Sequence, residues 1–149
     1  MHRSLKYRIP AAVGALLMLG VMVGTPLASA AGSPALKVSP KSKLVNGSTV
    51  QVSGKHFAPG DSVFVLQCVT ADQSLSGSGC NIANVVAVTI SSKGTFGPVA
   101  LKLKTGQIGS DTGTCGTSKT DAKACSVSAG NMSGGDKKQL TIAFTVPKA

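Results

Sequence analysis

Residues 62–80 read SVFVLQCVTADQSLSGSGC. The first eight residues form a near-continuous apolar run, which is typical of a strand in the middle of a sheet. A polar, Gly/Ser-containing segment follows and leads to Cys80, so that 11 residues separate it from Cys68. Cys115 and Cys125 repeat this arrangement with 9 residues between them. The stretch therefore predicts a buried strand that ends in a short loop bounded by cysteines.

Apolar and polar residues alternate along the other candidate strands, and no segment shows helical spacing. These strands are expected within residues 36–38, 49–53, 84–90, 99–104, 125–129 and 140–146, and the last shows the clearest alternation. Turn signals separate the segments at intervals of about 8–12 residues. Seven short strands predict an antiparallel β-sandwich, with a barrel as the structural alternative. Residues 105–124 are expected to form one long irregular connection.

The N-terminal residues have the composition of a secretory leader. Basic residues precede an uncharged apolar stretch at residues 11–23, and Ala-Ser-Ala at residues 28–30 is a small-residue cleavage site. We expect a signal peptide over residues 1–30, a flexible lead-in over 31–35 and one domain over 36–149. An uncleaved leader that anchors the chain is the alternative. The mature protein is therefore predicted to be secreted.

The composition beyond residue 30 restricts the possible functions. This part has 12 Lys and 5 Asp, lacks Arg, Glu, Trp and Tyr, and contains a single histidine, His56. The positive charge predicts weak attraction to anionic wall polymers or nucleic acid. The absence of Arg, Trp and Tyr argues against specific recognition of bases. One histidine supports neither a catalytic triad nor a zinc site, so we expect no catalytic residue, no metal and a protein that is not an enzyme. Separately, we expect the protein to be a monomer.

Four cysteines in an exported chain indicate disulfides rather than metal ligands or redox thiols. They allow three connectivities, and the sequence alone does not choose among them. We expect the local pairs Cys68–Cys80 and Cys115–Cys125, which each gain roughly 3 kcal/mol from restriction of the unfolded chain. An immunoglobulin-type bridge would instead join cysteines about fifty residues apart against a buried Trp, and this chain has no Trp.

Several short motifs accompany the cysteines: Val50 to Gly54, Gln67-Cys68, Cys80-Asn81 with Ala83, Ala124-Cys125-x-Val127, Ala129-Gly130-Asn131 and Leu140-x-Ile142-x-Phe144. With the cysteine spacing, they resemble the neocarzinostatin family from about residue 36 to residue 146. The resemblance implies an all-β, seven-stranded antiparallel immunoglobulin-like β-sandwich with two short-range disulfides. It also implies a secreted carrier that shields a non-covalent enediyne chromophore in an antibiotic system, where the chromophore and not the protein cuts DNA.

The resemblance places a ligand cleft beside the disulfide loops. The candidate ligand-binding residues are Gln67, Thr70, Ser78, Val85, Ser126 and Asn131. Four of them replace bulkier residues of the family pattern, Trp at Thr70, Leu at Ser78, Phe at Val85 and Gln at Ser126. Because stacking adds about 0.5–1.5 kcal/mol per aromatic pair, the cleft is expected to be more polar and to suit a more hydrophilic ligand, or to be a solvated groove.

Some of these residues could instead have a structural role without ligand binding. Gln67 and Asn131 are also suited to satisfying local backbone groups, and Val85 to the core or wall. For the whole protein, the alternative to a small-molecule carrier is an immunoglobulin-like module of the cell envelope. Such a module would use its lysines toward anionic polymer and bind no small molecule.

Overall fold

The computed structural model describes residues 32–70, 78–110, 113–133 and 135–146. The expected leader lies outside these ranges and stays a prediction. The first strand, β1, begins at Ala35, so the last residue of the expected lead-in already belongs to the sandwich. Within the described ranges, no helix has the length and apolar character needed to cross a membrane.

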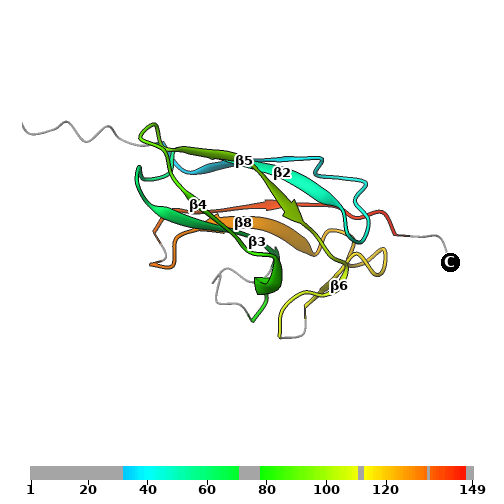
Figure 1. The fold of residues 1–149 in the computed structure, drawn as a ribbon. Coiled ribbons are helices and arrows are strands. Elements are labelled where there is room, and N and C mark those ends of the chain that lie inside the picture. Colours follow the sequence, from blue (N-terminus) through cyan, green and yellow to red (C-terminus); the bar gives the residue numbers. More distant parts are fainter. Residues whose placement is uncertain (1–31, 71–77, 111–112, 134, 147–149) are drawn as a thin grey trace, which may run out of the picture.

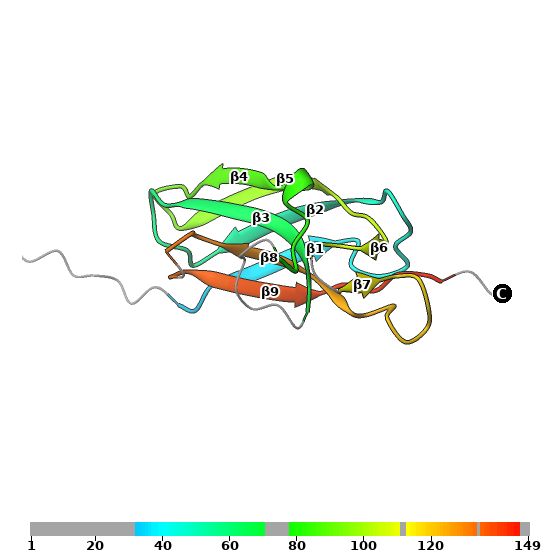
Figure 2. The same ribbon diagram turned by 90° about the horizontal axis from the view of Figure 1, so that it is seen from below.

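Two antiparallel sheets pack face to face (Figure 1). One has the strand order β1-β2-β5 and the other β4-β3-β8-β9. Their bounds are β1 Ala35–Ser39, β2 Thr49–Lys55, β3 Ser62–Val69, β4 Val86–Thr89, β5 Thr95–Lys102, β8 Cys125–Gly130 and β9 Lys137–Thr141. The view in Figure 2 shows the four-stranded sheet in front of the three-stranded one. The predicted sandwich of antiparallel strands is confirmed.

Alternating side chains fill the space between the sheets, because successive residues of a strand point to opposite faces. Val52 on β2 and Val65 on β3 are completely buried in this core. The rings of Phe57 and Phe96 meet edge to face with their centroids 5.4 Å apart. Gly54 makes room for them, since a Cβ there would lie 2.1 Å from the Phe96 ring.

The central strand β3 is covered on both faces, as its apolar run predicts. Val63 and Val65 face the main core, whereas Leu66 and Cys68 pack with Cys80 on the other side of the sheet. Apolar residues can therefore follow one another along β3 without exposure to water.

The closing segment differs from its prediction. Alternation predicted one strand over residues 140–146, but β9 spans Lys137–Thr141. Thr141 pairs with Ser126, near the first residue of β8, and beyond it the chain runs beside Leu44, which forms a bridge with Phe144. Burial continues to alternate across this change of partner because Ile142 and Phe144 both reach the core. The pattern thus indicated burial correctly but not the end of the strand.

Two other boundaries also shift. The 3-10 helix η1, Ile82–Asn84, occupies the start of the segment expected at 84–90, and β5 spans Thr95–Lys102 instead of 99–104. The connection expected to be irregular contains a two-residue ribbon of β6, Gly106–Gln107, and β7, Thr114–Cys115. These short strands lie at one end of the sandwich (Figure 2).

Both expected disulfides are present, Cys68–Cys80 and Cys115–Cys125. Asp121 organises the second loop, because its carboxylate accepts backbone hydrogen bonds from Thr117 at 2.9 Å and Ser118 at 2.7 Å. Burial is the largest single influence and raises the pKa of Asp121, but the hydrogen bonds from Thr117 and Ser118 together outweigh it and lower the pKa to about 2.

Candidate ligand pocket

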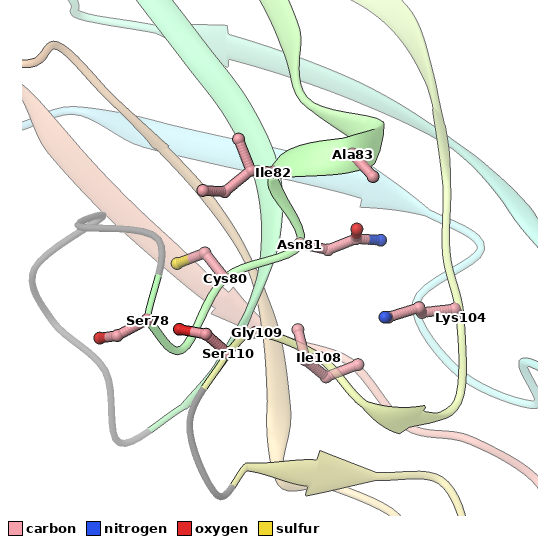
Figure 3. A pocket seen from close by; sticks show the side chains of 9 residues that line it. All are labelled: Ser78, Cys80, Asn81, Ile82, Ala83, Lys104, Ile108, Gly109 and Ser110. Carbon is pink, nitrogen blue, oxygen red and sulfur yellow. The ribbon is translucent and has the colours of Figure 1, made fainter.

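A pocket of about 460 Å³ lies between two segments that leave the sheets at the same end of the sandwich, residues 78–83 and 104–110 (Figure 3). Small-molecule sites in proteins have volumes of about 300–1,000 Å³. The lining residues are Ser78, Cys80, Asn81, Ile82, Ala83, Lys104, Ile108, Gly109 and Ser110. The pocket is thus built from the first disulfide loop and from the long connection that follows β5.

The first wall, residues 78–83, is fastened to β3. The Cys68–Cys80 disulfide joins them covalently. On either side of it, the Val69 N–H donates to the Gly79 carbonyl at 2.8 Å, and the Asn81 N–H donates to the Gln67 carbonyl at 2.7 Å. Because a covalent bond and two backbone hydrogen bonds act on one short stretch, this wall is held rigidly against the sheet.

The second wall, residues 104–110, is held by the side chain of Gln67. Its Nε2 donates to the Lys104 carbonyl at 2.8 Å, and its Oε1 accepts from the Lys104 N–H at 2.9 Å. Gln67 is only 1% exposed, and its Nε2 also lies 3.4 Å from the Cys115 Sγ. One buried amide therefore connects β3, the second wall and the second disulfide.

The two walls touch at Gly109. A Cβ at this position would lie 2.0 Å from the Ser78 carbonyl oxygen and 2.9 Å from the Cys80 backbone nitrogen. Only glycine permits such close approach of two backbones. Gly109 therefore sets the distance between the walls and closes one side of the pocket.

Two nitrogen donors enter the pocket from opposite walls. Figure 3 shows the side chains of Asn81 and Lys104 directed toward the same space, with Ile108 beside them. Asn81 is 3% exposed, and its Nδ2 has no hydrogen-bond partner among the described residues. Among the described residues, the lining contains no carboxylate and no imidazole. This arrangement suits binding of a hydrogen-bond acceptor rather than acid–base chemistry.

Of the six candidate residues, Ser78 lines this pocket directly. Gln67 is not among the described lining residues, but its side chain binds the backbone of the lining residue Lys104. Gln67 is buried and binds backbone, but this is the backbone of Lys104, 37 residues away, and not a local group as the alternative expected. The candidate position thus supports the second wall.

Three further candidates lie around the first disulfide. The Thr70 N–H donates to the Ala124 carbonyl at 2.7 Å, between the two disulfide loops. Ser126 is the register partner of Cys68 and is completely buried. Val85 is 37% exposed, and its N–H caps η1 by donating to the Ile82 carbonyl. None of the three belongs to the lining of this pocket.

Asn131 lies at the other end of the four-stranded sheet. It follows β8, five residues beyond Ser126, which corresponds to roughly 16 Å along a strand. Its Nδ2 donates to Asp61 at 3.0 Å, and its Oδ1 accepts from the Gly135 N–H at 2.8 Å. The structure therefore separates Asn131 from the other candidates and gives it local loop partners.

Two further carboxylates of the described residues, Asp61 and Asp136, have hydrogen-bond partners. The Asp136 carboxylate accepts from the Ala58 N–H, and Asp61 accepts from Asn131. His56 is exposed at the end of β2. Across the described ranges, no group of three His, Cys, Asp or Glu is arranged to hold a metal ion.

Sequence reasoning missed Lys104 as a pocket residue. It is the last residue of the strand expected over 99–104, but β5 ends at Lys102 and Lys104 is half-buried in the lining. Asn81 was noticed as part of a motif beside Cys80 without a role of its own. Its position directly after a disulfide cysteine was the available signal.

Comparisons with known proteins agree with this architecture. The model of the neocarzinostatin family matches residues 36–144. The structure of macromomycin is similar, with 28% identity and a TM-score of 0.57, over 76% of this chain and 100% of that chain. The solution conformation of apokedarcidin is similar with 29% identity and a TM-score of 0.51, over 76% of this chain and 99% of that chain.

Proposed function

The chain belongs to the neocarzinostatin family, and from this premise we propose that it is a secreted, non-enzymatic carrier that holds a small molecule non-covalently beside the Cys68–Cys80 disulfide. The fold of this family is that of enediyne chromophore-carrier apoproteins. Where the cargo is a reactive enediyne, the carrier serves an antibiotic system, and damage to DNA comes from the cargo.

The observation that supports this proposal most strongly is the pocket between two fixed walls. Preformed sites avoid the cost of ordering loops around a ligand, which improves affinity. Here a disulfide fixes one wall, Gln67 fixes the other, and Gly109 keeps them in contact. The described part of the lining has no aromatic residue, so the cargo is held by aliphatic contacts and hydrogen bonds instead of ring stacking.

The test is the state of the protein in its native culture. Beyond residue 30 the chain has no Trp or Tyr, so the purified protein itself absorbs little in the near ultraviolet. We expect strong additional absorption, and native mass spectrometry should show an extra mass that is lost after denaturation. The polypeptide that remains should have the mass of residues 31–149. A native protein with the bare polypeptide mass and no added absorption would overturn the carrier function.

One observation favours a second candidate, the cell-envelope module. Lys37, Lys55 and Lys102 are exposed on the outer face of the β1-β2-β5 sheet, and these three strands contain no acidic residue. Such a face attracts anionic polymers, and salt weakens the attraction. Co-sedimentation with purified cell walls at low and high salt tests it, with the triple Lys→Gln variant as control. Binding that is unchanged in that variant would exclude this face.

A further inference from the structure

We propose that the pocket selects a ligand carrying an anionic oxygen group, such as a carboxylate, which the Asn81 Nδ2 and the Lys104 Nζ bind from opposite walls. This inference rests on the proposed carrier function and goes beyond it by naming the chemical class of the cargo.

The first argument is the unpaired amide of Asn81. Roughly nine in ten buried polar groups in proteins are hydrogen-bonded, so each exception calls for an explanation. The backbone of Asn81 is fixed by hydrogen bonds to Gln67 and from Asn84. Its side chain is nevertheless 3% exposed, lines the pocket, and leaves Nδ2 without a partner among the described residues. A ligand oxygen in the pocket supplies the missing acceptor.

The second argument is the charge opposite this amide. Lys104 is anchored on both sides of its Cα, through its N–H and its carbonyl, by the side chain of Gln67. Its side chain lines the pocket, and the lining residues that the structure describes include no carboxylate to offset the ammonium charge. Hydrogen bonds from a charged donor to a charged acceptor are roughly twice as strong as neutral ones. The lining therefore favours an anion over a neutral acceptor and disfavours a cation.

The third argument is the apolar surface beside the two donors. The described lining contains four apolar residues, of which Ile82 and Ala83 are exposed, whereas Ile108 and Cys80 are almost completely buried. A ligand that uses both regions has a compact apolar body and one acidic group. Because the wall is aliphatic, the acidic group and not stacking provides the selectivity.

The experiment titrates three probes of one shape into isotope-labelled protein of residues 31–149: biphenyl-4-carboxylate, biphenyl-4-carboxamide and biphenyl-4-ylmethylammonium. We expect the carboxylate to bind with a dissociation constant at least about tenfold lower than the other two, a difference of about 1.4 kcal/mol. The side-chain NH₂ resonance of Asn81 should move during this titration and not with the ammonium probe.

Matched variants separate this pocket from general charge attraction. Lys104→Met should abolish the tenfold preference, whereas Lys102→Met, the same change at the exposed end of β5, should keep it. Asn81→Leu should weaken carboxylate binding while the unfolding midpoint stays equal or rises, because removal of an unpaired buried donor does not destabilise the fold. A loss of binding accompanied by a lower midpoint would assign Asn81 a structural role and overturn its part in the inference.

Other outcomes would overturn the whole inference. They are undetectable carboxylate binding at about 10 mM, equal affinity for the three probes, preference for the ammonium, or equal loss in Lys102→Met and Lys104→Met. The carrier function is judged separately by the native protein. A cargo without an acidic group would leave the carrier function standing and reject the anionic class.

Discussion

Replacement of Gln67 by Leu should destabilise the protein by removing the side chain that holds the second pocket wall. Leu is apolar and of similar volume, so the change acts mainly through the lost hydrogen bonds to the Lys104 N–H at 2.9 Å and carbonyl at 2.8 Å. Each contributes about 0.5–1.5 kcal/mol, and the partly buried backbone groups left without a partner add to the loss. We expect the free energy of unfolding to fall by about 2–4 kcal/mol.

Urea and thermal unfolding of residues 31–149, followed by far-ultraviolet circular dichroism, measure this loss, because these residues include no Trp or Tyr as fluorescent probes. For a domain of this size the thermal midpoint should fall by about 8–16 °C. Gln51→Leu makes the same change on the exposed face of β2 and should alter stability by no more than about 0.5 kcal/mol. If the two variants unfold at the same midpoint, Gln67 does not stabilise the second wall and the reasoning is refuted.

Three further predictions concern other contacts. Gly109→Ala should cost about 1–3 kcal/mol of unfolding free energy and weaken probe binding, because the new Cβ collides with the Ser78 carbonyl 2.0 Å away; unchanged midpoint and binding would show that the walls separate freely. Gly54→Ala should cost at least as much without a specific effect on the pocket, since its Cβ would lie 2.1 Å from the Phe96 ring, and thermal unfolding with probe titration checks both points. Because the pKa of Asp121 is lowered from 3.8 to about 2, its stabilisation is fully present above pH 4 and should be lost as the pH falls toward 2. The loss should be about 1 kcal/mol or less for so accessible a group, and urea midpoints for Asp121→Asn should lack this part of the pH dependence.

The sheets of the protein could be predicted from sequence because apolar and polar residues alternate along strands that have one buried face. Val50 and Val52 alternate with polar residues and lie in the core, and the apolar run of β3 corresponds to a strand covered on both faces. Alternation does not identify the hydrogen-bond partner, however. Residues 140–146 therefore read as one strand although the chain changes from β8 to the segment around Leu44 after Thr141.

The sequence indicated the loops that build the pocket better than it indicated the individual residues that line it. The cysteine pairs indicated the loops that build the pocket, whereas Lys104 was included in a strand by extending the alternation of β5 beyond its last residue. Gln67 was singled out as a candidate ligand residue, but a sequence cannot tell whether an amide faces a ligand or a backbone. The missing partner of Asn81 is a property of three-dimensional packing and leaves no pattern in the sequence.

The two walls of the pocket differ in how they are attached to the sandwich, and this has a consequence for evolution and design. Residues 78–83 are tied to β3 by a covalent bond, so changes there affect the integrity of the sheet. Residues 104–110 are secured at Lys104, restricted at Gly109 and packed into the core at Ile108, which leaves the exposed side chain of Ser110 as the independent variable of this wall. Evolution or protein engineering can therefore change the lining of the pocket at Ser110 while the scaffold folds unchanged.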